Sequence, residues 1–147
     1  MSPFVLLVIA PIWFWWAGRL AAIDFREHRL PDRLVLPAYP VLGLLLLANG
    51  TNVRTVAVVG ITAICAVISG YVLHRLAGLG LGDVKLGGVC TAALTATGAL
   101  APGLIAIALI GGLHATIHAG IVRSLRDEMP FGPAILTGTT LGLLSTI

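Results

Sequence analysis

Two aspartates are the residues of this chain whose surroundings suggest shared chemistry. Asp24 opens the stretch "DFREHRLPDR", and Asp83 follows Gly80 and Gly82 in the stretch "GLGLGDVKL". A pair of carboxyl groups can activate water with its ionised member and polarise a carbonyl group with its protonated member. The chain holds only six acidic residues, so each of them can be examined for such a role.

The two glycines before Asp83 have two interpretations. Gly80 and Gly82 permit a positive φ angle and let another backbone approach closely, which suits a place where an extended peptide lies beside Asp83. The same residues also suit a flexible turn in which Asp83 is the N-cap of the following helix. The sequence leaves both interpretations open.

Lys85 and Asp32 are further candidates for the site. Lys85 follows Asp83 by two residues, so on a helix the two side chains point about 200° apart. Lys85 either extends its ammonium group to the membrane interface or contacts a substrate. Asp32 lies eight residues after Asp24 and is a second candidate acid, with an N-cap or a substrate contact as its natural role.

The composition indicates the elements that must position these residues. Hydrophobic residues make up 58% of the 147 residues, charged residues only 10%, and the mean hydropathy is +1.03. These values predict an integral membrane protein with one domain, residues 1–147. A span needs roughly 20 apolar residues, so we expect an all-α, polytopic bundle of about six transmembrane helices. The expected spans are 3–22, 34–48, 55–73, 86–101, 103–122 and 131–147.

Prolines and glycines refine these boundaries. Pro37 and Pro40 predict a kink in the second span, and Pro102 with Gly103 predicts the break between the fourth and fifth spans.

The basic residues predict an orientation. Eight of them lie at one face of the expected bundle and Arg54 alone lies at the other, which by the positive-inside rule makes the loops after the first, third and fifth spans cytoplasmic. Both termini then face outward, and Asp24 and Asp83 share the cytoplasmic face. The eight residues are Arg19, Arg26, Arg29, Arg33, Arg75, Lys85, Arg123 and Arg126.

Other classes of site are not supported. The basic residues are scattered between apolar runs, so we expect no nucleic-acid partner. "GLGLGD" lacks both the dinucleotide glycine spacing and a Walker lysine, so we expect no cofactor. His114 and His118 share a helix face, but Ala115 stands where a metalloprotease has glutamate, and we expect contacts between helices there rather than a metal site.

The order of the motifs "DFREHRLPDRLVLP", "GLGDVKL" and "MPFGPAIL" resembles the type IV prepilin peptidases and archaeal preflagellin peptidases, the prokaryotic GxGD aspartyl peptidases. The resemblance covers most of the chain. It implies a membrane aspartyl endopeptidase with Asp24 and Asp83 as the catalytic pair. It further implies substrate contacts by Gly80, Gly82, Lys85 and Asp32, without a cofactor or metal.

The resemblance also implies a partner and a location. The substrate would be a type IV prepilin or prepilin-like (pseudopilin) helix with a short basic leader, cut after a glycine at the cytoplasmic face of the inner membrane. The chain is similar to the short peptidases of tight-adherence pilus systems, which lack a segment with paired CxxC motifs. The alternative is a non-enzymatic pilus-assembly scaffold or small transporter in which the two aspartates make structural or ion contacts. Which aspartate is the base stays open.

Overall fold

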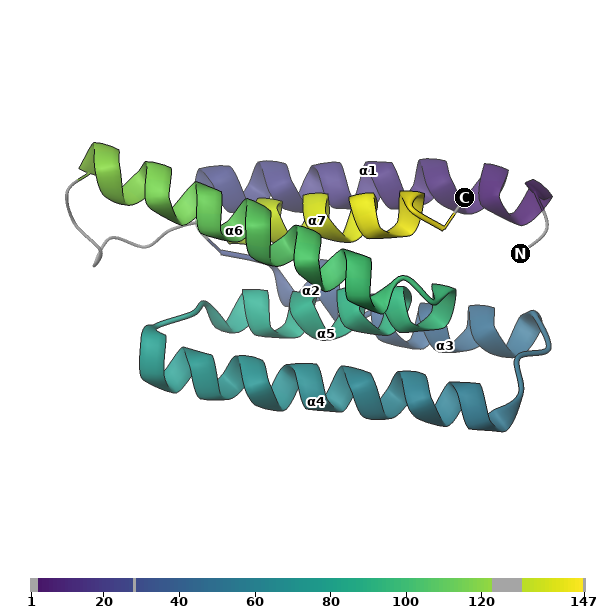
Figure 1. Cartoon of the computed structure of the whole chain (residues 1–147). Coiled ribbons are helices and arrows are strands. Elements are labelled where there is room, and N and C mark those ends of the chain that lie inside the picture. The colour runs from purple at the N-terminus through teal and green to yellow at the C-terminus, as the bar shows by residue number, and fades with distance from the viewer. Residues whose placement is uncertain (1–2, 28, 123–130, 147) are drawn as a thin grey trace.

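The computed structural model describes residues 3–27, 29–122 and 131–146, and every element within these ranges is a helix. The all-α prediction is therefore confirmed for this part of the chain. The helices, labelled in Figure 1, are α1 Pro3–Glu27, α2 Asp32–Val35, α3 Ala38–Ala48, α4 Val53–Ala77, α5 Leu81–Thr97, α6 Leu100–Val122 and α7 Gly132–Leu144.

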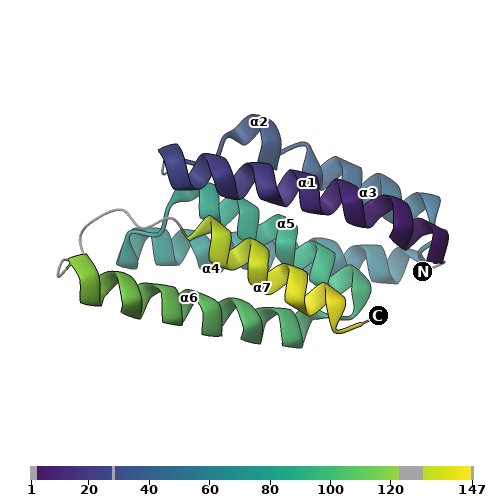
Figure 2. The same ribbon diagram turned by 90° about the horizontal axis from the view of Figure 1, so that it is seen from above.

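Helix α5 is the centre of the bundle. It contacts α2, α3, α4, α6 and α7, and the long helices run side by side along one direction (Figures 1 and 2). Eight of its 17 residues are buried, among them Leu86, Cys90 and Leu94. The first turn of α5 carries Asp83, so the central position of the helix places this acid inside the bundle.

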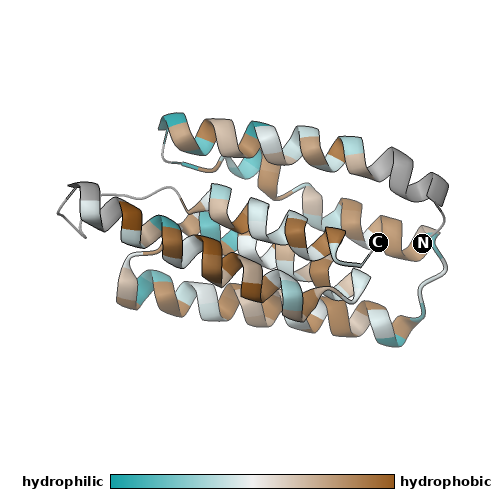
Figure 3. Ribbon diagram, turned by 45° about the horizontal axis from the view of Figure 1, so that its top comes forward, coloured by the Kyte–Doolittle hydropathy of each residue, from teal (hydrophilic) through white to brown (hydrophobic). Residues whose placement is uncertain are grey.

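The outer helices have the apolar exposed surface of a membrane protein. Within the described residues, two helical segments are long and apolar enough to cross a bilayer, Val53–Ala77 and Leu100–Ile117. Helix α4 buries Val59 and Ala63, whereas Ile64 and Ile68 are each 60% exposed, and brown apolar bands cover much of the ribbon in Figure 3. Such surface suits lipid contact. The full count of six spans stays a prediction.

The helices that carry the two aspartates are longer than predicted. Helix α1 continues to Glu27, so Asp24 lies within it instead of after it. Helix α5 begins at Leu81 and not at residue 86, so Asp83 is its third residue. Polar residues continue a helix once its backbone bonds can form, which a boundary drawn from hydropathy alone misses.

The predicted break at Pro102 and Gly103 is wrong. Helix α5 ends at Gly98, which has a left-handed φ of 76°, and α6 begins at Leu100. Pro102 therefore lies in the first turn of α6, where the missing proline N–H has no helical partner to lose.

The second expected span is two helices and not one kinked helix. Leu36 and Pro37 separate α2 from α3, although both residues keep right-handed helical φ and ψ angles. Proline cannot donate the backbone bond that a continuous helix needs. The Leu34 carbonyl instead accepts a hydrogen bond from Trp16 Nε1 at 2.9 Å, which ties the short helix α2 to α1.

Two glycines let α7 pack directly on the backbone of α6. A Cβ atom on Gly138 would lie 2.5 Å from the Ile107 nitrogen, and one on Gly142 would lie 2.5 Å from the Gly103 Cα. Close approach through small residues is the usual way in which membrane helices gain packing energy. This contact holds α7, which begins at Gly132, against α6.

Candidate active site

Asp24 is held inside the bundle by the last turns of α1. Its side chain is 3% exposed, and its Oδ2 accepts a hydrogen bond from the Gly132 backbone N–H at 3.1 Å. Because Gly132 is the first residue of α7, its N–H has no carbonyl partner within that helix. The first backbone N–H of α7 therefore donates a hydrogen bond to a carboxylate that lies 108 residues earlier in the chain.

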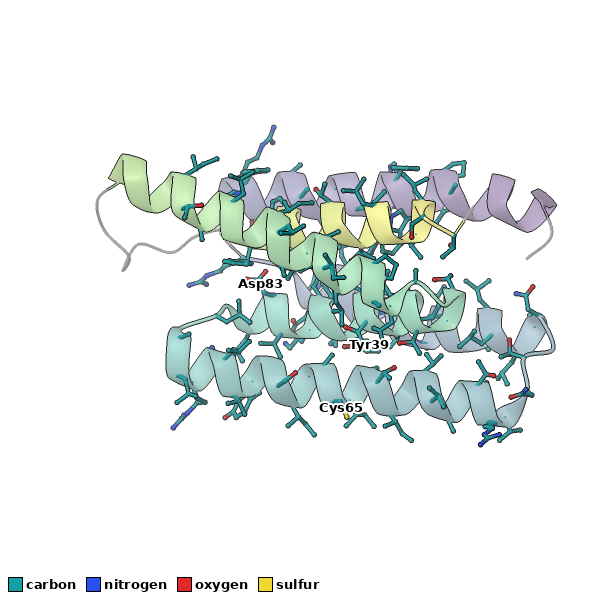
Figure 4. All side chains as sticks on the ribbon, in the orientation of Figure 1. Tyr39, Cys65 and Asp83 are labelled. Atoms are coloured by element: carbon teal, nitrogen blue, oxygen red, sulfur yellow. The ribbon has the colours of Figure 1, made fainter. Side chains whose placement is uncertain are left out.

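Asp83 lies in the first turn of α5, on the side of the helix that faces α1 and α7 (Figure 4). It is 8% exposed, and its Oδ1 is buried without a hydrogen-bond partner. Of the two interpretations of this stretch, the one that makes Asp83 the N-cap is wrong, because Gly80 occupies that position and no side-chain cap bond forms. Asp83 therefore has no structural bond at Oδ1 that would explain its burial.

The structure brings Asp24 and Asp83 together. Burial, and after it the negative charge of Asp24, raise the pKa of Asp83 from 3.8 to about 7. Burial acts because an ionised carboxylate loses hydration, and Asp24 acts because like charges repel across short distances. The pair thus contains one acid that keeps its proton near neutral pH, which is a property of carboxyl pairs that hydrolyse peptides.

Gly82 serves a close approach, but to this chain itself. A Cβ atom at Gly82 would lie 2.7 Å from Leu30 Cβ and 3.3 Å from the Leu30 nitrogen. Among the described residues, positive φ angles occur at Gly50, Gly78 and Gly98, so conformational freedom is not what Gly80 and Gly82 supply. At Gly80 a Cβ atom would lie 3.0 Å from Asp83 Oδ2. Both glycines therefore leave room beside the acid.

Leu30 and Gly132 are two parts of the site that the motif analysis did not select. Leu30 is buried between Gly82 and the start of α7, since a Cβ atom at Gly132 would lie 3.4 Å from Leu30 Cδ1. The same atom would lie 2.7 Å from Asp24 Oδ2. Gly132 belongs to the quoted stretch "MPFGPAIL", but it acts through its backbone N–H, which the residue type does not indicate.

Lys85 and Asp32 meet each other at the edge of the site. Lys85 Nζ lies 2.7 Å and 2.8 Å from the two carboxylate oxygens of Asp32. The predicted N-cap role of Asp32 is wrong, because Pro31 occupies that position and no cap bond forms. Tyr39, which Figure 4 labels, donates its hydroxyl to the Lys85 carbonyl at 2.8 Å. These bonds connect α2 and α3 with α5.

Some residues of the sequence analysis lie outside the described residues. These are Arg123 and Arg126, and the side chain of His118 is also not described. His114 lies half-buried on α6. In the ranges that the structure describes, no group of three or more His, Cys, Asp or Glu residues could hold a metal ion.

Comparison with known proteins identifies a family. The model of the type IV leader peptidase family matches residues 11–118, which include both aspartates. The chain is 29% identical over 163 aligned positions to the prepilin leader peptidase/N-methyltransferase of Escherichia coli (strain K12), and the alignment covers 97% of this chain. This chain spans 66% of the length of that relative. No solved structure matches the chain.

The family match extends over most of the chain and carries Asp24 and Asp83 within it. Family membership and the two apolar helices indicate a peptidase of the membrane. The chain belongs to the type IV leader peptidase family.

Proposed function

We propose that this protein is an aspartyl endopeptidase that removes the leader peptide from type IV prepilins or prepilin-like proteins. The observation that carries the proposal is the buried pair of Asp24 and Asp83, whose charges interact and which lie in the two motifs of the family resemblance. The family match supports the substrate class.

The reaction needs three tasks from the pair. One carboxylate takes a proton from water, so that the water oxygen can bond to the carbonyl carbon of the scissile peptide. The other carboxyl group donates a proton to the carbonyl oxygen, and the leaving amine then receives a proton as the C–N bond breaks. Asp83 suits the donor task in particular, because its raised pKa of about 7 leaves a substantial fraction of it protonated near neutral pH.

We further propose that the site faces the cytoplasm from the inner membrane. The C-terminal end of α1, the loop between α4 and α5 and the end of α6 lie at one end of the bundle in Figure 1. Six of the eight basic residues that predict this face are in the described part of the chain. An alkaline phosphatase fusion after Ile147 should be active and one after Arg126 inactive, and the reverse pattern would contradict the orientation.

The decisive experiment is co-expression with candidate prepilins that carry a basic leader and a hydrophobic helix. Wild type should shorten the prepilin, detected as a mobility shift, and Asp24→Ala and Asp83→Ala should not. Glu27→Gln is the matched control, because Glu27 is an exposed acid on α1, three residues from Asp24. Failure of the wild type to cleave any prepilin would favour the scaffold or transporter alternative.

A further inference from the structure

The two carboxyl groups of the site have unequal surroundings. Asp24 accepts the Gly132 N–H at 3.1 Å, and this donor is the first amide of a 13-residue helix. The N-terminus of a helix carries a partial positive charge, and an amide that donates to a carboxylate stabilises its ionised form. These two effects act in the same direction on Asp24.

Within the residues that the structure describes, Asp83 differs from Asp24 at its Oδ1 atom. Its Oδ1 is buried and unpartnered, although the residue lies in the first turn of α5. An unpartnered buried oxygen favours the neutral carboxyl group, because the charged form loses hydration without compensation. The raised pKa of Asp83 has the same direction, with burial as the larger cause and the negative charge of Asp24 as the second.

The other ionisable groups near the pair do not reverse this difference. Lys85 is bound to Asp32 at 2.7 Å, and Glu27 on α1 is exposed. On α4, His74 Nδ1 lies 2.6 Å from the Leu79 carbonyl, to which it donates. Helix α7 carries no ionisable side chain from 132 to 144. Within the described ranges Asp83 therefore forms no ion pair.

We propose that Asp24 is the ionised member of the pair and the general base, that Asp83 carries the proton and is the general acid, and that the Gly132 amide distinguishes them. The names base and acid rest on the proposed function, whereas the position of the proton can be measured without substrate.

The assignment gives a balanced reaction. Asp24 takes a proton from water as the water oxygen bonds to the peptide carbonyl carbon, and Asp83 gives its proton to the carbonyl oxygen. In the second step Asp24 returns its proton to the amine nitrogen as the C–N bond breaks. Asp83 then takes a proton from one hydroxyl of the intermediate, so both carboxyl groups end as they began.

The test is a pH titration of the protein in liposomes, followed by the infrared C=O stretch of protonated carboxyl groups. Wild type should show a buried carboxyl signal that titrates near pH 7. Asp83→Asn should remove it, and Asp24→Asn should keep it with a lower midpoint, because the repelling charge is gone. Glu27→Gln should leave it unchanged.

Three results would overturn the assignment. The signal could disappear in Asp24→Asn and persist in Asp83→Asn, which reverses the roles. The signal could disappear in both variants, which would mean that the two aspartates share one proton. It could also persist in both variants, which would mean that another carboxyl group gives the signal. None of these depends on cleavage, so they are distinct from a failure of the proposed function.

Gly132→Ala tests the amide itself. The new methyl group would lie 2.7 Å from Asp24 Oδ2, so the carboxylate must move away from its donor. We expect at least a tenfold loss of kcat with KM nearly unchanged, and the acid limb of the pH–rate profile should move to higher pH. Gly112→Ala on α6 is the control, because open space surrounds that position. An unchanged pH profile in Gly132→Ala would remove the amide from the proposal.

Discussion

Replacement of Gly82 by alanine should damage catalysis more than it damages the fold. The new Cβ atom would lie 2.7 Å from Leu30 Cβ, whereas carbon atoms in contact prefer about 3.5 to 4.0 Å. Leu30 and the first turn of α5 must therefore separate by about 1 Å. Overpacking of this kind costs about 1 to 3 kcal/mol of folding free energy.

The effect on rate follows from the position of Asp83, one residue after Gly82. A displacement of about 1 Å in a catalytic group can lower the rate about 100-fold, so we expect a loss of that order in kcat. The measurement is the rate of leader removal from a purified prepilin in liposomes, with the thermal unfolding midpoint recorded on the same sample.

The chain offers a matched control and a rescue. Gly87 lies on the same helix with nothing within 4 Å of its Cβ position, so Gly87→Ala should retain the wild-type rate. Leu30→Gly removes the clashing Cβ atom, and in that background the further loss from Gly82→Ala should be small, as expected for coupled neighbours. A Gly82→Ala rate within twofold of wild type would refute the close contact with Leu30.

Three other changes have clear expected outcomes. Asp83→Asn should raise the unfolding temperature at pH 8 and have little effect at pH 4, since folded Asp83 keeps its proton up to about pH 7 while the unfolded group releases it near 3.8. The free energy of unfolding of the wild type should thus fall by on the order of 4 kcal/mol as the pH rises from 3.8 to about 7. An equal pH dependence of stability in Asp83→Asn would contradict this assignment to Asp83. The ion pair can be exchanged by combining Asp32→Lys with Lys85→Asp. If the pair only connects α2 with α5, the double variant should recover the cleavage rate that either single variant loses. A double variant with a cleavage rate as low as that of Lys85→Asp would instead indicate that Lys85 contacts substrate. Gly142→Val should lower the amount of folded protein in the membrane, because the new side chain would clash with the Gly103 backbone. The measurement is the detergent-resistant fluorescence of a C-terminal fusion. Gly43→Ala should leave this amount unchanged, because nothing lies within 4 Å of its Cβ position.

The sequence predicted the helical class and the two aspartates because these depend on local pattern: apolar runs for the helices, and an acid within a recognisable motif for the site. It misplaced the end of α5, although Gly98 as a left-handed helix end and Pro102 in a first turn are both regular signals. The prediction used Pro102 and Gly103 as the helix break, and it therefore placed the end of this helix at residue 101 instead of Thr97.

The remaining features depend on contacts between distant parts of the chain. The pairing of Lys85 with Asp32 spans 53 residues and requires the break between α2 and α3, which turns α2 toward α5. The hydrogen bond from Gly132 to Asp24 is donated by a backbone N–H, so the residue type at position 132 does not predict it. The contact of Gly82 with Leu30 likewise depends on the path of the loop after α1, which positions Leu30.

The bond between Asp24 and Gly132 has a consequence for the synthesis of the protein. Asp24 leaves the ribosome early, but its amide donor is made 108 residues later, as α7 begins. A nascent chain that has inserted α1 to α6 therefore holds both acids without the group that orients one of them. If the protein has the proposed function, proteolytic activity would then require that α7 is in place, and a chain that stalls before this step would lack the complete site.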